Sequence, residues 1–296
     1  MSSVELAVAN PVSCETVNHV PSPKSSTSQT GIAFAGVMAG EIKELSEELR
    51  YRWCPAGQYT MGTPGATDSE SPVDVALSNG FWVGETVVTQ RHWQSLIGTR
   101  PWQDKPKVSQ HEDSPATYVS HHDAVRYCET LTSVELSAGH LPAGWVCVLP
   151  TEAQWEYACR AGTTTNFSFG DSESRLDDYG WYARRSWLDR FGRILNAGRT
   201  STGKYAHRVG LKKPNDWGIR DMHGNVWEWC SDWYSDTLPG GCDPVGPQSG
   251  ERRVNRGGSW SGLAEFCRAA DRGSYSPDGN TSDLGFRIAS VESAAA

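Results

Sequence analysis

The chain has 296 residues, 35 of them acidic and 27 basic, so its formal net charge is −8. An acidic balance with no run of lysine or arginine argues against electrostatic binding to nucleic acid or to an anionic membrane surface. No apolar stretch reaches the roughly 18 residues that a membrane-spanning helix needs, so no membrane span is expected.

The first 40 residues are rich in Ser, Thr, Pro and Val, and this composition predicts a disordered tail over residues 1–40. The start lacks a basic segment followed by a long apolar core, so no signal peptide is expected. We therefore expect a cytoplasmic location, with export as the alternative. Cys14 lies in the tail, which leaves seven of the eight cysteines for the folded part. An odd number leaves at least one thiol outside intrachain disulfides, which favours a reducing compartment.

Apolar spacing at Ile42, Leu45 and Leu49 predicts a short helix over residues 41–49. Two short strands are expected on either side of residues 55–57, followed by a further β-rich run.

Capping signals predict three helices after this β-rich run. One begins at Thr89, a second begins at Ser120 with a capping box to Asp123, and the third begins at Thr151 with a capping box to Gln154. Glycines end the first and the third helix, at Gly98 and Gly162.

Beyond residue 162 the helical periodicity disappears. The alternation in GNVWEWCSDWY predicts a strand with two distinct faces. Further strands are expected near 253–256, 266–271 and 284–289.

Five motifs follow one another between about residue 50 and residue 290: PAGQYTMG, LPTEAQWEYACRAGT, WGIRDMHGNVWEWCSDWY, RVNRGGSW and LGFRIA. In sequence and in order they resemble the formylglycine-generating enzyme (sulfatase-modifying factor) family. The resemblance implies one α+β domain over residues 41–290, related to the C-type-lectin fold, with little regular secondary structure and a short tail at 291–296. It implies less about activity, because a fold does not fix a function.

The resemblance also implies what an active member needs. Active members use molecular oxygen and a Cu(I) ion held by two cysteines to oxidise a sulfatase cysteine to formylglycine, and soft thiolates suit Cu(I). The first ligand follows the serine of a Gly-Gly-Ser turn by three residues, and the second follows five residues later. Counting from Ser259 gives Gly262 and Cys267, whereas counting back from Arg272 puts Ala264 at the second position. One thiolate cannot form the pair, so copper is not expected.

A calcium site of the family falls on DMHGNVWE. The resemblance implies the side chains of Asp221 and Glu228 and the carbonyls of Gly224 and Val226 as ligands, and such hard oxygen donors suit Ca²⁺. The alternative is that Asp221 caps a turn and Glu228 pairs with an arginine.

Three residues are weak catalytic candidates. Cys230 and Cys267, on strands that the family places near the site, could form a disulfide, a redox pair or a metal site, and the alternative is two buried inert thiols. Ser259 resembles a nucleophile elbow only loosely, and a turn residue is the simpler interpretation.

Three functions follow from these observations. The first is a non-oxidising family member that binds an unknown protein or small-molecule ligand through loop side chains on a rigid scaffold. The second is an oxidoreductase of the formylglycine-generating type with an atypical site. The third is a target-binding protein diversified by a retroelement over residues 253–290. The exposed candidates for the binding surface are Trp227, Trp260, Leu263, Glu265, Tyr275, Asp278 and Asn280.

Overall fold

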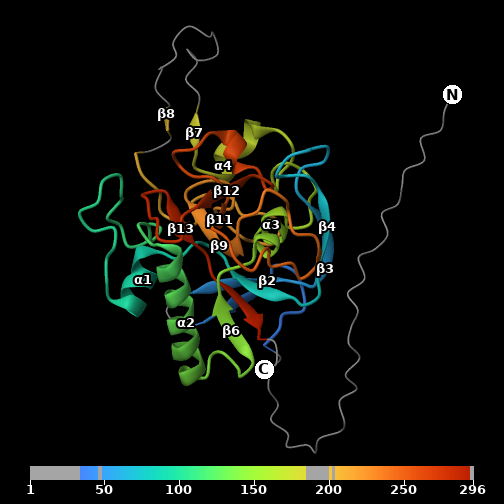
Figure 1. Ribbon diagram of the computed structural model, residues 1–296. Helices are drawn as coiled ribbons and strands as arrows, with labels where there is room; N and C mark the ends of the chain where they lie inside the picture. The colour runs from blue at the N-terminus through green and yellow to red at the C-terminus, as the bar shows by residue number, and fades with distance from the viewer. Residues whose placement is uncertain (1–33, 46–48, 185–199, 202–203, 294–296) are drawn as a thin grey trace, which may run out of the picture.

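Four sheets and four α-helices make up the part of the chain that this computed structural model describes, residues 34–45, 49–184, 200–201 and 204–293 (Figure 1). The α-helices are α1 (Gln90–Ile97), α2 (His121–Ala138), α3 (Glu152–Arg160) and α4 (Leu176–Tyr179), and the 3-10 segments are η2 (Glu173–Arg175) and η4 (Ala264–Cys267). The strands are β1 (Ile42–Glu44), β2 (Arg50–Cys54), β3 (Gly57–Met61), β4 (Val73–Leu77), β5 (Phe81–Gly84), β6 (Trp145–Val148), β7 (Ala183–Arg184), β8 (Thr200–Ser201), β9 (Trp227–Trp233), β10 (Gly241–Cys242), β11 (Arg253–Arg256), β12 (Arg272–Tyr275), β13 (Leu284–Phe286) and β14 (Ala289–Glu292). Long loops join these short elements, so the fold is α+β with little regular secondary structure, as predicted.

The strand order brings the end of the chain into the centre of the molecule. The five-stranded sheet has the order β1-β2-β5-β14-β6, so the last strand lies between strands from the first half of the chain. The four-stranded sheet has the order β12-β11-β9-β13, in which β13 runs parallel to β9. α1 and α2 lie together beside the five-stranded sheet, and β3 and β4 lie on the opposite side of the molecule (Figure 1). Among the described helices, none has the length and apolarity needed to cross a membrane.

The three longer helices begin where their capping residues predict. Thr89, Ser120 and Thr151 each accept a hydrogen bond from the backbone N–H three residues later, and each completes a capping box. α3 ends one residue earlier than predicted, because Ala161 rather than Gly162 adopts the left-handed conformation at its C-cap.

Two segments differ from the sequence prediction. Residues 42–44 form a strand that pairs with residues 50–52, although their spacing predicts a helix. Pairing with a neighbouring strand outweighs a weak local preference over so few residues. The strand expected at 266–271 begins only at Arg272, because the residues before it form η4 and pack beneath a glycine turn.

Residues 34–40 and 291–293, expected in the two tails, belong to the fold. The Trp82 indole N–H donates a hydrogen bond of 3.0 Å to the carbonyl of Phe34. At the other end, β14 pairs with β6, and the N–H of Ser293 donates to a loop carbonyl at 2.7 Å. The remaining residues of the predicted tails lie outside the described part of the chain.

Tryptophans organise the larger hydrophobic core. The ring of Trp53 lies 5.0 Å from that of Trp82 and 6.4 Å from that of Trp145, so the indoles of three strands pack together. The α2 face predicted from Ala124, Cys128 and Leu131 is buried against this cluster. Burying each large side chain contributes about 1.5–3 kcal/mol of transfer free energy.

A fully buried ion pair ties the two larger sheets together. Arg287, between β13 and β14, donates to both carboxylate oxygens of Glu228 on β9, at 2.8 and 2.7 Å. The Trp155 indole of α3 donates to the same carboxylate at 2.7 Å. The other Arg287 donors reach three backbone carbonyls, so its guanidinium is fully satisfied. Burial opposes the charge, but the Glu228 carboxylate raises the pKa of Arg287.

A second buried network joins α3 to the four-stranded sheet. Arg256 of β11 is fully buried and donates to Glu156, which also pairs with Arg160 at 2.7 Å. Glu152 holds Arg272 of β12 through two bonds, of 2.7 and 2.8 Å. Ion pairs as well as apolar packing therefore hold α3, β11 and β12 together.

Asp232 of β9 is a buried acid beside this network. Its Oδ2 accepts a bond of 2.9 Å from the N–H of Glu152, and its Oδ1 has no partner among the described residues. Burial raises the pKa of Asp232 to about 7, and the Glu152 carboxylate adds to the rise. The folded state therefore keeps a proton that the unfolded chain releases near pH 3.8.

Removing the cation of the Arg287–Glu228 pair should lower the stability of the folded protein. Arg287→Met leaves Glu228 buried without its partner, and we expect urea denaturation to show a loss of about 3–5 kcal/mol in the free energy of unfolding. Arg50→Met is the control, because Arg50 pairs with Glu44 on the surface, and its effect should be far smaller. Similar losses in the two variants would contradict the structural role of the buried pair.

Asp232 should make stability depend on pH. A carboxyl whose pKa is higher in the folded state contributes most below its unfolded pKa, so the free energy of unfolding should fall as the pH rises from 3.8 to about 7. The slope from one proton is at most about 1.36 kcal/mol per pH unit. Asp232→Asn should flatten this part of the profile, and the exposed control Asp236→Asn should not. A profile that Asp232→Asn leaves unchanged would refute the assignment.

Candidate functional site

The Gly257-Gly258 turn follows β11 and covers η4. Both glycines have positive φ, 96° and 72°. A Cβ at Gly258 would lie 2.6 Å from the carbonyl oxygen of Phe266 and 2.8 Å from Sγ of Cys267. Only glycine therefore combines this conformation with the close approach of η4.

Cys267 lies beneath that turn as a buried thiol. Its side chain is fully buried, and its Sγ is 3.8 Å from the carbonyl oxygen of Leu263. Burial raises the pKa of the Cys267 thiol, so the protonated form dominates near neutral pH. A protonated and enclosed sulfur is a poor nucleophile and a poor metal ligand.

Cys230 does not join Cys267 in a common site. Both thiols are free and fully buried, but Cys230 lies in the cluster around Trp155 whereas Cys267 packs with Phe167 and Leu176. Burial raises the pKa of Cys230 as well. Within the described residues, no group of three or more His, Cys, Asp or Glu side chains could hold a metal ion.

The cysteines differ in redox state. Among the described residues, six cysteines are free and buried: Cys54, Cys128, Cys147, Cys159, Cys230 and Cys267. Cys242 of β10, in contrast, is disulfide-bonded.

Gly262 has room for a side chain. Its N–H donates to the carbonyl of Ser259 at 3.0 Å, and its own carbonyl accepts from Ala183 of β7 at 2.6 Å. A Cβ at Gly262 would meet the ring of Phe266 at 3.6 Å, which is ordinary van der Waals contact. Position 262 therefore faces the Phe266 ring, whereas the Cys267 thiol lies under Gly258.

Ser259 belongs to a cluster of hydroxyls around one carboxylate. Its Oγ donates to Oδ2 of Asp283 at 3.2 Å, Ser261 donates to the same oxygen at 2.7 Å, and Thr281 donates to Oδ1 at 2.7 Å. The cluster fixes the turn to the loop before β13. Asp283 and Thr281 are not predicted from the sequence, where their only signal is their place just before LGFR.

The seven candidate surface residues differ in exposure. Trp260, expected to be exposed, is only 6% exposed, because its ring packs with Val87, Ala206 and Val226. Two candidates are half-buried, Trp227 and Leu263, and four are exposed, Glu265, Tyr275, Asp278 and Asn280.

The exposed candidates are attached to two different parts of the fold, the start of α2 and the β3–β4 loop. Tyr275 ends β12, and the loop that follows it rests on the start of α2, where His122 lies 3.4 Å from Asp278. Glu265, in contrast, is on η4, which is linked to the β3–β4 loop by the ion pair of Arg268 with Glu70 at 2.8 Å. A ligand of the surface would therefore contact an α2-side loop, an η4-side segment or both.

The two carboxylates implied as calcium ligands, Asp221 and Glu228, differ in their hydrogen bonding. Asp221 is buried with φ of 59°, and its Oδ2 accepts from the N–H of Gly210 at 2.7 Å. Its Oδ1 has no partner among the described residues, and burial raises the pKa of Asp221 to about 6. Glu228, in contrast, already accepts from Arg287 and Trp155.

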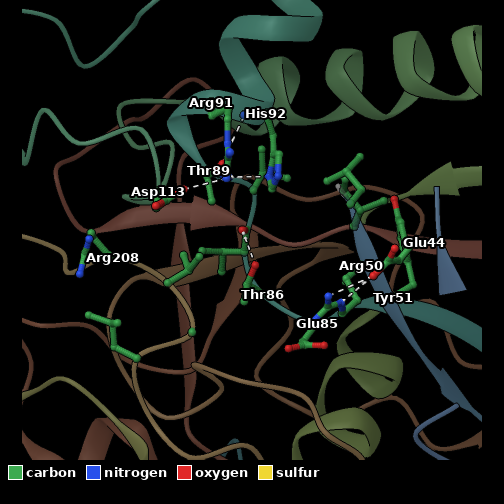
Figure 2. Close-up of a pocket in the computed structure, with 18 residues that line it drawn as sticks. Glu44, Arg50, Tyr51, Glu85, Thr86, Thr89, Arg91, His92, Asp113 and Arg208 are labelled. Carbon is green, nitrogen blue, oxygen red and sulfur yellow. Dashed lines mark hydrogen bonds and ion pairs between the residues drawn. The ribbon is translucent and has the colours of Figure 1, made fainter. Parts of the chain in front are cut away.

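A cavity of about 610 Å³ lies elsewhere, between β2, β5, the start of α1 and the loop at residues 208–211 (Figure 2). Its lining contains none of the candidate residues from the sequence. The sequence carried no motif for it, because its walls come from segments that are far apart in the chain, from Glu44 to Ile288.

Comparisons with known proteins agree on one family. The family described as "Sulfatase-modifying factor enzyme 1-like domain" matches residues 41–291. The formylglycine-generating enzyme of Streptomyces coelicolor is 34% identical over 219 residues, covering 71% of this chain and 60% of that protein. The enzyme of Mus musculus is 34% identical over 291 residues, covering 79% of this chain and 73% of that protein. The chain thus spans less than two thirds of the Streptomyces relative.

Solved structures with the same fold include two that match over nearly their whole length. Treponema denticola variable protein 1 has a TM-score of 0.67 and 29% identity, covering 84% of this chain and 98% of that chain. PvdO from Pseudomonas aeruginosa has a TM-score of 0.71 and 24% identity, covering 86% of this chain and 99% of that chain, which shows the fold alone.

Proposed function

Because the chain belongs to the sulfatase-modifying factor enzyme 1-like family, we propose that it is a ligand-binding member that does not oxidise cysteine. The observation that carries this proposal is the placement of Cys267. Its thiol is enclosed beneath Gly258, and the position five residues before it is Gly262, which has no side chain. Cu(I) chemistry of the formylglycine-generating type needs two thiolates directed at one point.

The binding surface that we propose is the pair of exposed segments described above, on the α2 side and the η4 side. Their backbones are held by hydrogen bonds to fixed elements, such as the N–H of His121 to the carbonyl of Pro277 at 3.0 Å. Exposed side chains such as Tyr275 and Asn280 therefore stand on a rigid base, which lowers the entropic cost of binding. The ligand is a protein or a small molecule.

A variable target-binding protein is the second candidate. Its support is the structural likeness to Treponema denticola variable protein 1, at 29% identity. A reverse transcriptase gene nearby, together with a second, imperfect copy of the coding sequence for residues 253–290, would favour this candidate. Their absence from the genome would favour an invariant binding module.

Calcium is the cofactor that we propose for this family member. Asp221 would supply its unpartnered Oδ1, together with the carbonyls of Gly224 and Val226. The Glu228 carboxylate would join this set only by giving up part of its bonding to Arg287 and Trp155. The support is that a buried carboxylate oxygen without a donor is costly unless a cation or a proton compensates it.

The oxidase function should be absent. With Cu(I), oxygen and a thiol reductant, the protein should leave a peptide containing Cys-x-Pro-x-Arg unchanged by mass spectrometry, and the Streptomyces enzyme serves as the positive control. Gly262→Cys should also remain inactive, because the Cys267 thiol stays buried beneath Gly258 in the variant. Aldehyde produced by the wild type and lost in Cys267→Ser would overturn the proposal and restore the atypical-oxidase function.

Calcium removal should destabilise the wild type. A site at a hundredfold excess of Ca²⁺ over its Kd contributes about 2.7 kcal/mol, so a chelator should lower the Tm of the wild type. Asp221→Asn keeps an oxygen for the N–H of Gly210 but loses the charge, and its Tm should not respond to chelator. The exposed control Asp278→Asn should respond as the wild type does. Equal melting of the wild type with and without chelator would contradict a calcium site.

A further inference from the structure

The cavity beside α1 has an apolar wall and a polar mouth. Its volume of about 610 Å³ lies in the range of small-molecule sites. The apolar lining residues are Leu49, Val87, Val88, Val209, Leu211 and Ile288. Leu211 is 53% exposed at the mouth, whereas Val87 and Ile288 are buried, so apolar surface runs from solvent into the interior.

Most of the charges around the cavity are already neutralised. Arg50 pairs with Glu44 at 3.0 Å, and Arg91 pairs with Asp113 at 2.8 Å. Glu85 lies between two cations outside the lining, Arg52 at 2.8 Å and Arg220 at 3.3 Å. Figure 2 shows Arg208 and Asp113 on one side of the cavity and Arg50 and Glu44 on the other.

Arg208 is the lining cation for which the described residues provide no carboxylate partner. Its Nη1 lies 3.4 Å from Nε2 of His111. The Nδ1 of His111 accepts from the backbone N–H of Asp113 at 3.1 Å and lies 3.8 Å from Oδ2 of the Asp113 carboxylate. The Arg208 guanidinium thus contacts an imidazole and, among the described residues, no carboxylate, and its remaining N–H groups can donate to an anionic oxygen at the mouth of the cavity.

His92 supplies a further donor in the wall. Its Nδ1 accepts from the N–H of Thr89 at 3.3 Å, as part of the cap of α1, so the neutral ring carries its proton on Nε2. The side chain is 8% exposed, and Nε2 has no acceptor among the described residues. Burial lowers the pKa of His92 to about 4, so the ring is a neutral donor at physiological pH.

From these contacts we propose that the cavity binds a small monocarboxylate with an apolar body. The carboxylate lies on Arg208 at the mouth, and the apolar body packs on the valine, leucine and isoleucine wall. One unpaired guanidinium matches one negative charge, and a planar carboxylate can accept two of its N–H groups. A dianion fits less well, because the carboxylates of Glu44, Glu85 and Asp113 also face the cavity. This site is separate from the loop surface and does not depend on its function.

The test is calorimetric titration of the full chain with octanoate, octanamide and octyl phosphate. Octanoate should bind saturably at one site per chain, and octanamide should bind at least about tenfold more weakly, since a charge-assisted bond contributes about 1.5–3 kcal/mol. Arg208→Leu should weaken octanoate by about tenfold or more and leave octanamide unchanged. The matched control Arg126→Leu removes an arginine that is 70% exposed on α2, and it should change neither affinity.

A second variant keeps the test independent of the arginine. Leu211→Asp places a carboxylate at the mouth, and it should weaken octanoate more than octanamide. The melting temperatures of the unliganded variants should match that of the wild type, since both substituted side chains are exposed. No saturable binding of octanoate, equal affinities for acid and amide, or tighter binding of octyl phosphate would each overturn the proposal.

Discussion

The structure depends on the desolvated charge of Arg287. A guanidinium can be buried only when all of its N–H groups find acceptors, and this one uses the Glu228 carboxylate and three backbone carbonyls. The acceptors come from β5, the loop before β9, and β9 itself. The two larger sheets therefore have one relative placement in which the guanidinium finds all of these acceptors. In that placement the C-terminal strand β14 lies between strands from the first half of the chain.

The region around the Gly-Gly-Ser turn rests on this frame. The Trp155 indole reaches Glu228, and Gly257 approaches the ring of Trp155, so α3, β9 and the turn share one buried contact. η4 then occupies the space below Gly258, and it encloses the Cys267 thiol. The same packing that stabilises the turn removes the sulfur from solvent, and the binding function that we propose for this chain rests on that enclosure.

Two kinds of surface result from this architecture. The loops that carry Tyr275 and Glu265 display side chains from a rigid base, and their composition can change without disturbing the ion pairs below. The cavity beside α1 is different, because its walls are core residues of β5 and the helix cap of His92. If both proposals hold, specificity at the loops depends on exposed side chains, whereas specificity in the cavity depends on Arg208.

The sequence by itself determined the family and the starts of the helices at Thr89, Ser120 and Thr151, along with β9 and β11, because capping and alternation are local signals. It also placed Gly262 where a ligand cysteine would stand. Only the tertiary structure decided that residues 42–44 form a strand, that Trp260 is buried, and that Cys230 and Cys267 lie in separate clusters. Arg208, His92 and Leu211 likewise meet at one cavity only after folding. Pairing, burial and convergence depend on contacts between distant segments, and no local pattern of residues encodes them.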